Sequence, residues 1–216
     1  MMLNLSKPIL YLITRGATDD TTTTESVEFQ RVLLQVSAAV AAGIPLIQIR
    51  EKHLTSRVLF ELTMRVVSIA HGTATRVLVN DRADIAAGSG AHGVHLTTQS
   101  LEAAVIRKTF GDGFLIGTST HSIGEARTAS DGGADFIVFG PIFATSSKRN
   151  YGPPVGVQAL TDVARELTPF PVLALGGVSV SNAENCLRAG ASGIAGMSLF
   201  SELERLQVIA EAIKRI

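Results

Sequence analysis

The chain has 216 residues, enough for one large domain such as an α/β barrel. Its 19 basic and 19 acidic side chains cancel, so no global field favours nucleic acid or an anionic membrane as a partner. The single cysteine, Cys186, excludes an internal disulfide and predicts a cytoplasmic protein with a small buried thiol. The first apolar run, at 9–14, is too short to span a bilayer and lacks signal-peptide features.

Eight short apolar or β-branched runs predict eight strands. In chain order they lie at 9–14, 45–50, 76–80, 93–97, 114–119, 136–143, 172–176 and 194–200. Helical periodicity between them predicts helices at 27–42, 56–70, 101–109, 123–131, 157–167, 181–189 and 202–216, with a shorter segment at 83–88. This alternation favours a closed barrel over an open sheet. We therefore expect an α/β fold, a single-domain (β/α)8 TIM barrel spanning residues 1–216.

Charged side chains follow the second predicted strand. Side chains alternate along a strand, so Gln48, Arg50 and Lys52 share one face and Glu51 lies on the other. Two cations and an amide at the end of a buried strand need an anion to offset their lost hydration. A phosphate or diphosphate would serve, and so would carboxylates of nearby residues. This segment alone leaves both interpretations open.

Other predicted strands also end in polar residues, and in an eight-stranded barrel these ends form the working face. Asp81 is the best metal candidate because a hard carboxylate suits Mg²⁺, but it would serve equally well as a helix N-cap. His121 could transfer protons near neutral pH or be a hydrogen-bonded loop residue. His95 lies within a strand, which favours a structural role.

Glycine-containing segments end the last two predicted strands. Gly176 and Gly177 follow the seventh strand, and the sequence GMS at 196–198 ends the eighth. Backbone N–H groups of such loops bind phosphate in many barrels, so we expect a phosphate cradle here. After the sixth strand, Thr145, Ser147 and Lys148 form a hydroxyl-rich loop with one cation, which is typical of an anion-binding loop.

Together these strand ends resemble a known set. The chain is similar, along essentially its whole length, to the family that joins thiamine phosphate synthases with thiazole tautomerases. The matching motifs are QIREK at 48–52, ND at 80–81, GVHL at 93–96, GTSTH at 117–121, GPIFATSSK at 140–148, GG at 176–177 and GIAGMS at 193–198. Each motif is modest alone, but their order and register are specific.

The resemblance implies an enzyme that condenses an aminopyrimidine diphosphate with thiazole phosphate, or its carboxylate form, to give thiamine phosphate and diphosphate. It implies small phosphorylated substrates, with no nucleic acid or membrane partner, and leaves homo-oligomerisation open. Catalytic roles would fall to Arg50, Lys52, Ser119, His121 and Lys148. Substrate contacts would come from Gln48, Arg50, Lys52, Asn80, Ser119, Thr145, Ser147, Lys148, Gly177 and Ser198.

Within these sets the resemblance gives finer roles. Gln48, Arg50 and Lys52 would hold the diphosphate, helped by Ser119 and Lys148, while Asn80 would contact the pyrimidine. Asp81 would ligate Mg²⁺, the expected cofactor. Thr145 and Ser147 would position the thiazole and phosphates, and backbone N–H groups of Gly177 and Ser198 would bind the thiazole phosphate.

Two positions depart from the family pattern. Ser100 occupies the place of the aspartate that usually supplies a second carboxylate to Mg²⁺, and loss of that charge should weaken the site. Glu102 could compensate only if its loop shifts. Arg15 stands at the end of the first strand, where an acidic or small polar residue is usual.

The Ser100 departure keeps a second function open. Tautomerases of this family isomerise the thiazole carboxylate phosphate without a metal, and His121 would then be the proton shuttle. The retained diphosphate residues favour the synthase. A third alternative, from another class, is a regulator that binds thiazole or pyrimidine without catalysis.

Overall fold

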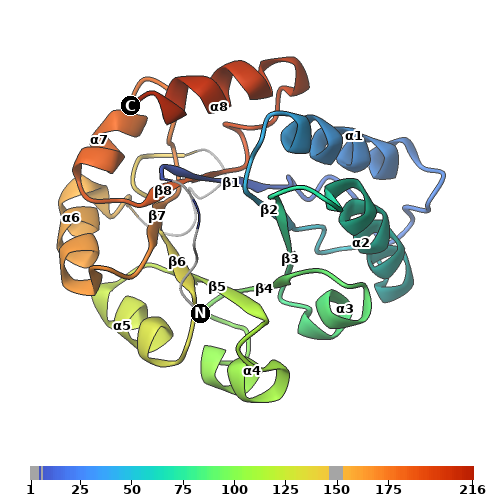
Figure 1. Ribbon diagram of the computed structural model, residues 1–216, viewed down its shortest axis with the longest axis horizontal. Coiled ribbons are helices and arrows are strands. Elements are labelled where there is room, and N and C mark those ends of the chain that lie inside the picture. The colour runs from blue at the N-terminus through green and yellow to red at the C-terminus, as the bar shows by residue number, and fades with distance from the viewer. Residues whose placement is uncertain (1–4, 6, 146–152) are drawn as a thin grey trace.

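The structure is a computed structural model that describes residues 5, 7–145 and 153–216. Within these residues, eight parallel strands close into a barrel in chain order, and β8 pairs with β1 (Figure 1). The strands are β1 (Ile9–Ile13), β2 (Leu46–Ile49), β3 (Arg76–Asn80), β4 (Gly93–Leu96), β5 (Leu115–Thr120), β6 (Phe136–Phe139), β7 (Val172–Ala174) and β8 (Gly193–Gly196). The predicted (β/α)8 barrel is confirmed.

Helices surround the barrel, as Figure 1 shows. They are α1 (Val27–Ala41), α2 (Ser56–Ala70), α3 (Ala83–Gly88), α4 (Ala103–Phe110), α5 (Ile123–Asp131), α6 (Gly156–Leu167), α7 (Ala183–Arg188) and α8 (Leu206–Lys214). A 3₁₀ turn, η2 (Leu203–Arg205), leads into α8. Cys186 is fully buried in α7, as predicted. No helix within the described part of the chain is long and apolar enough to cross a membrane.

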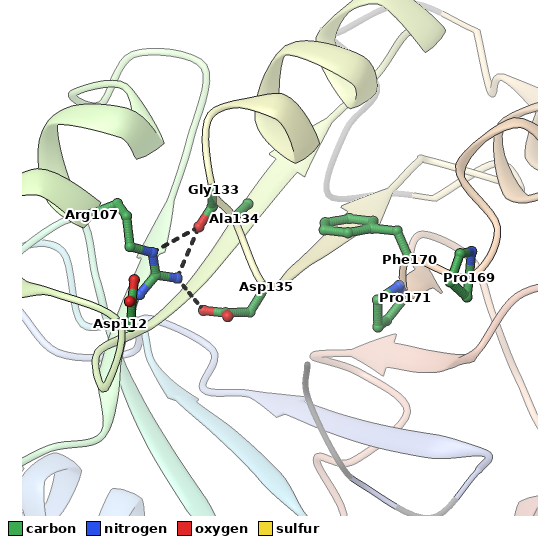
Figure 2. Close-up of a pocket in the computed structure, with 8 residues that line it drawn as sticks. All are labelled: Arg107, Asp112, Gly133, Ala134, Asp135, Pro169, Phe170 and Pro171. Atoms are coloured by element: carbon green, nitrogen blue, oxygen red, sulfur yellow. Dashed lines mark hydrogen bonds and ion pairs between the residues drawn. The ribbon is translucent and has the colours of Figure 1, made fainter. Parts of the chain in front are cut away.

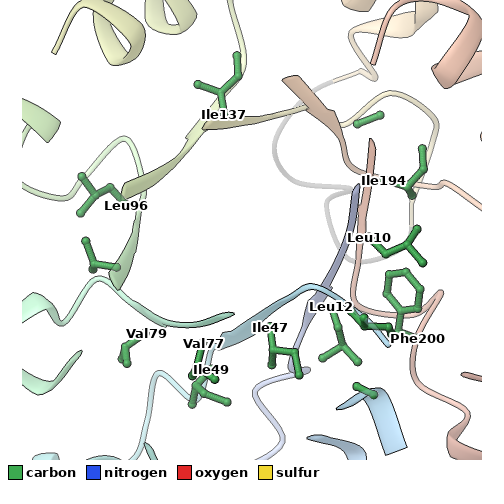
Figure 3. Packing of buried hydrophobic residues seen from close by; sticks show 14 of the residues in the cluster. Leu10, Leu12, Ile47, Ile49, Val77, Val79, Leu96, Ile137, Ile194 and Phe200 are labelled. Carbon is green, nitrogen blue, oxygen red and sulfur yellow. The ribbon is translucent and has the colours of Figure 1, made fainter. Parts of the chain in front are cut away.

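Alternation of side chains along the strands produces two separate cores. Residues such as Tyr11, Leu46 and Phe136 point inward and fill the barrel. Their strand neighbours, such as Ile47 and Val77, point outward and pack beneath the helices (Figure 3). Both faces of every strand are therefore buried, which explains why the strands read as continuous apolar runs in the sequence.

Two glycines allow the strands of the barrel to approach closely. A Cβ atom on Gly93 would lie 1.8 Å from the carbonyl oxygen of Leu115 on the neighbouring strand, and one on Gly193 would lie 2.0 Å from that of Ile9. Neither strand backbone can move without breaking its ladder of hydrogen bonds. Glycine at these positions is therefore a condition of closing the barrel.

Two strands, β6 and β8, end four residues earlier than the sequence predicts. The apolar run at 136–143 leaves the sheet after Phe139, because Pro141 has no N–H to donate to a ladder. The run at 194–200 leaves it after Gly196, and Phe200 folds back into the outer core, where its carbonyl accepts from Gln35 Nε2 at 2.9 Å. These runs are apolar because they are buried, although they are not strands throughout.

A cavity of about 400 Å³ lies at the amino-terminal ends of the strands, away from the expected working face (Figure 2). Arg107 lines this cavity. Its guanidinium group donates to the carbonyls of Gly111, Phe114 and Gly133 and forms an ion pair with Asp135 at 2.7 Å. These contacts join the loops that enter β5 and β6. The charge of Arg107 is therefore satisfied within the fold and is not available to a ligand.

We predict that Gly93→Ala lowers the free energy of unfolding by more than about 4 kcal/mol, since the new methyl group overlaps backbone of a paired strand. The matched control is Gly124→Ala in α5, where no atom lies within 4 Å of the added carbon. This control should be neutral or stabilising by up to about 1 kcal/mol. Urea unfolding followed by circular dichroism measures both, and equal stability of the two variants would contradict the packing argument.

Candidate active site at the strand ends

A polar cavity of about 350 Å³ opens at the carboxyl ends of the strands. Six residues predicted from the sequence line it together: Gln48, Arg50, Lys52, Asn80, Ser119 and His121. Residues without a predicted substrate contact complete the lining: Ile13, Arg15, His95, Thr97, Thr98, Gln99, Leu175 and Met197. The structure thus brings these six predicted residues into one pocket.

The basic wall of this pocket consists of Arg15, Arg50 and Lys52. None of the three forms an ion pair within the described residues, and no carboxylate is among the residues that line the cavity. Burial, and then the nearby charge of Arg50, lower the pKa of Lys52, while the charge of Asp81 partly opposes the shift. Of the two interpretations of this cluster, the described contacts therefore favour a bound anion over neighbouring carboxylates.

Glu51 lies on the opposite side of the strand end, as alternation predicts, and is 2% exposed. Its carboxylate accepts from the backbone N–H groups of Gly16 and Thr18 and from Thr18 Oγ1, the last at 2.7 Å. The N–H of Arg50 in turn donates to Thr14 Oγ1 at 2.8 Å. These contacts fasten the loop after β1, which carries Arg15, to the end of β2.

Gln48 and Asn80 form a pair on the inner wall. Gln48 Nε2 donates to Asn80 Oδ1 at 2.9 Å. Gln48 Oε1 is buried and has no partner within the described residues. An unpaired buried acceptor is costly, so this atom is suited to receive a donor from a substrate.

A neutral hydrogen-bonded chain supports the floor of the pocket. Tyr11 Oη lies 3.2 Å from His95 Nδ1, and His95 Nε2 lies 2.9 Å from Ser119 Oγ. Burial, with a smaller effect of Arg50, lowers the pKa of His95 to about 3, and burial raises the pKa of Tyr11. His95 is therefore an uncharged residue that orients Ser119, in agreement with the structural role predicted for it.

His121 lies at the mouth of the pocket after β5. Its Nδ1 contacts the carbonyl oxygen of Gly140, which can only accept, so Nδ1 carries the proton. Its backbone N–H donates to Glu125 Oε2 at 2.6 Å. The ring is held by its neighbour, and Nε2 is the atom left to face a substrate.

Asp81 does not cap a helix, because the N-cap position of α3 is Arg82. It has a φ of 61°, which is rare for a residue other than glycine, and its N–H donates to the carbonyl of His95 at 2.9 Å. A strained backbone of this kind concentrates at functional sites. The N-cap alternative is therefore wrong for Asp81, and the metal role stays a prediction.

Ser100 occupies the position at which the resemblance leads us to expect a second carboxylate. Ser100 Oγ accepts from the N–H of Thr97 at 2.7 Å, and both Ser100 and Glu102 line a different cavity from the strand-end pocket. No group of three metal-ligating side chains gathers anywhere in the described part of the chain. Mg²⁺ commonly binds through one or two carboxylates together with substrate phosphates. Asp81 does not line the strand-end pocket, but its charge acts on Lys52, which does, so this carboxylate could share an ion with a diphosphate held there.

A second cavity of about 220 Å³ adjoins the first, and the two share Arg15, Leu175 and Met197. Its lining includes Thr145, Gly176, Gly177 and Ser198, all expected there from the sequence. Gly176 and Gly177 have φ values of 97° and 64°, and a Cβ on Gly177 would lie 2.6 Å from the carbonyl of Ala144.

The backbone of this second cavity is suited to an anion. In the described part of the structure, the N–H groups of Gly177 and Ser198 make no hydrogen bond. Arg15 adds a positive charge beside them. Free N–H groups and a cation at the ends of β7 and β8 are what a phosphate cradle requires. Ser147 and Lys148, the remaining predicted contacts, lie outside the described residues.

Comparisons with known proteins agree with this arrangement. Residues 10–200 match the family model described as thiamine monophosphate synthase. The thiamine-phosphate synthase of Anaeromyxobacter dehalogenans is 43% identical over 158 residues, covering 73% of this chain and 70% of that one. The thiamine-phosphate synthase of Chlorobium phaeovibrioides is 40% identical over 177 residues, covering 82% and 84%.

A solved structure, thiamine phosphate pyrophosphorylase from Pyrococcus furiosus, superposes with a TM-score of 0.77 at 26% identity, covering 95% of this chain and 96% of that one. Fold and cavities thus define a (β/α)8 barrel with its polar pockets at the strand ends. The chain belongs to the thiamine monophosphate synthase family. The resemblance inferred from the sequence is confirmed.

The low pKa of His95 predicts a pH dependence of stability. In the folded state the His95 ring takes up a proton only near pH 3, whereas in the unfolded chain it does so near pH 6.5. As the pH falls from about 6.5 towards 3, protonation therefore favours the unfolded chain, and the free energy of unfolding decreases. Between pH 7 and 5 the protein should lose about 2 kcal/mol more unfolding free energy than a His95→Gln variant. Urea titrations of both proteins at the two pH values measure the difference, and parallel losses would mean that His95 titrates normally.

Proposed function

We propose that this protein is a thiamine-phosphate synthase, which joins an aminopyrimidine diphosphate to thiazole phosphate and releases diphosphate. The observation that carries the proposal is a wall of three cations beside a glycine cradle, where the cations form no ion pair and the N–H groups of Gly177 and Ser198 no hydrogen bond among the described residues. One pocket suits a diphosphate and the adjoining one suits a phosphate. The relatives named above bear the name of this enzyme.

In the proposed reaction, the carbon–oxygen bond between the pyrimidine methylene and the diphosphate breaks, and its electron pair leaves with the diphosphate. The lone pair of the thiazole nitrogen then forms the new carbon–nitrogen bond. This chemistry requires charge stabilisation of the leaving group more than a strong base. Arg50 and Lys52 supply that charge, with Ser119 as a hydrogen-bond donor held in place by His95.

Gln48 and Asn80 are assigned to the pyrimidine. The atom that Gln48 leaves unpaired is Oε1, an acceptor, which suits an amino group on the ring. A phosphate oxygen is itself an acceptor and gains nothing from this atom. The proposal thus moves Gln48 from the diphosphate, where the sequence resemblance puts it, to the ring.

The phosphate of the thiazole is assigned to the N–H groups of Gly177 and Ser198, with Thr145 beside them. Arg15 lines both cavities, so it is placed between the two phosphorylated groups and can contact either. In the sequence this arginine is only a departure from the expected pattern, whereas its place beside both cavities supports assigning it to substrate binding. Ser147 and Lys148 keep their predicted roles.

Mg²⁺, if bound, would be held by Asp81 and by oxygens of the diphosphate, and it would supply further positive charge to the leaving group. Its single protein carboxylate predicts a weak site. A cytoplasmic location stays an expectation from the sequence. Whether the chain forms a homo-oligomer stays open.

The comparisons give no support to the tautomerase, and nothing in the described geometry favours the non-catalytic regulator. His121 is compatible with either enzyme, because its Nε2 faces the same pocket in both cases. Activity assays therefore decide between the functions.

We predict that the purified protein converts thiazole phosphate and aminopyrimidine diphosphate, with Mg²⁺ present, into thiamine phosphate and diphosphate. Arg50→Gln should lower kcat by roughly 100- to 1000-fold, because it removes charge that stabilises the leaving group. Arg31→Gln, which removes an exposed arginine of α1, should leave kcat unchanged. Conversion of the thiazole carboxylate tautomer without metal, together with no thiamine phosphate, would overturn the synthase in favour of the tautomerase.

A second prediction concerns the metal. Ser100→Asp can keep the hydrogen bond from the N–H of Thr97 while adding a carboxylate to the loop. The Mg²⁺ concentration for half-maximal synthesis should fall about tenfold. Ser100→Asn, which has the same shape without the charge, should show the parent requirement. An equal change in both variants would mean that charge at this position does not reach the ion.

A further inference from the structure

A third cavity, of about 430 Å³, lies on the outer side of β5, between α4 and α5. We call it the side pocket. Its lining consists of Leu96, Thr97, Thr98, Ser100, Leu101, Glu102, Ala103, Ala104, Thr118, Ser119, Thr120, Glu125, Thr128, Ala129 and Gly132. It adjoins the strand-end pocket through Thr97, Thr98 and Ser119, but its other lining residues belong to it alone. Its volume lies within the range of small-molecule sites.

The β5 face of the side pocket carries two unpaired hydroxyl groups. Thr118 Oγ1 and Thr120 Oγ1 are buried and have no partner within the described residues, and Thr120 is 1% exposed. Other buried threonines are satisfied, as Thr75 Oγ1 is by the carbonyl of Ile44 at 2.9 Å. Two buried hydroxyls without partners, at successive outward positions of one strand, indicate that a bound group supplies their hydrogen bonds.

The walls of the side pocket are apolar and small. Ala103 and Ala104 of α4, Ala129 of α5 and Gly132, which follows α5, line it and leave its space unfilled. Leu101 adds an exposed apolar side chain, with 65% of its surface accessible. A flat, largely apolar molecule would pack against these small residues.

The charge of the side pocket is opposite to that of the strand-end pocket. Glu102 and Glu125 line it, and no lysine or arginine is among its described lining residues. A phosphorylated compound would be repelled there, whereas a cation would be attracted. The side pocket is therefore not an extension of the phosphate sites.

We propose that the side pocket binds a small flat organic cation with N–H donors at both ends, of the protonated aminoheteroaromatic class. One end reaches the hydroxyls of Thr118 and Thr120, the ring packs against the alanines, and the positive charge faces the two glutamates. The proposal does not depend on the reaction catalysed at the strand ends.

The test uses 4-aminopyridine, which is protonated at neutral pH, as the probe. Aniline is a neutral compound of similar size, and benzoate is an anion. In titrations of the full chain followed by NMR, 4-aminopyridine should shift the signals of Thr118, Thr120 and Ala129 with a dissociation constant on the order of 1 mM or tighter. Aniline should bind more weakly, and benzoate should shift signals only near Arg50.

Three variants locate the site. Thr120→Val removes the unpaired hydroxyl at nearly constant shape, so it should weaken binding of 4-aminopyridine about three- to tenfold without lowering the thermal midpoint. Thr75→Val, its matched control, removes a paired hydroxyl elsewhere, so it should lower the midpoint and leave binding unchanged. Ala129→Leu should fill the side pocket and abolish binding, with an unchanged circular dichroism spectrum.

Several results would overturn the proposal. Equal affinity for 4-aminopyridine and benzoate would show that charge does not select the ligand. A lowered thermal midpoint in Thr120→Val, with binding intact, would show that the hydroxyl is satisfied within the protein. If size-exclusion chromatography shows an oligomer that Ala129→Leu dissociates, the side pocket is an interface between copies of the chain.

Discussion

The basic wall of the candidate active site depends on the buried carboxylate of Glu51. This carboxylate accepts three hydrogen bonds from Gly16 and Thr18, so its charge is satisfied on the outer side of the strand end. Alternation then places Arg50 and Lys52 on the cavity side. Glu51 therefore does not neutralise the two cations, although it lies between them in the sequence. The same hydrogen bonds fix the loop that carries Arg15. One buried acid thus sets both the charge and the shape of the pocket.

β5 shows how one strand can serve two cavities of opposite character. Ser119 bonds to His95 inside the barrel, whereas Thr118 and Thr120 face the side pocket. The loop after β5 links the two, because the N–H of His121 donates to Glu125, which lines the side pocket. The two pockets meet at uncharged residues, Thr97, Thr98 and Ser119, while their charged side chains line opposite sides of β5.

Much of this architecture follows from local sequence patterns. Periodicity locates every strand of the barrel, and the rule that barrels work at their strand ends correctly groups Gln48, Asn80 and Ser119. Patterns do not separate burial from strand pairing, so they assign Phe200 to a strand although it only packs in the core. The hydrogen bond between Gln48 and Asn80 joins residues 32 positions apart. It depends on the stagger between β2 and β3, which no local sequence pattern predicts.

The same limit applies to Asp81 and Arg15. The positive φ of Asp81 accompanies its hydrogen bond to the carbonyl of His95 on the next strand, so sequence alone permits an N-cap that the fold excludes. Arg15 is an isolated departure in the sequence because its neighbours in space come from β2, β7 and β8.

Arg15 and Ser100 together change the balance of charge at the proposed site. Ser100 keeps the hydrogen bond that closes its own turn but carries no charge, while Arg15 adds a cation where the resemblance leads us to expect an acidic or small polar residue. In the proposed reaction, stabilisation of the leaving diphosphate therefore depends more on side-chain cations and less on a metal held by two carboxylates. Because guanidinium groups keep their charge over the physiological pH range and need no metal supply, this balance suits a synthase that works with a weakly bound ion.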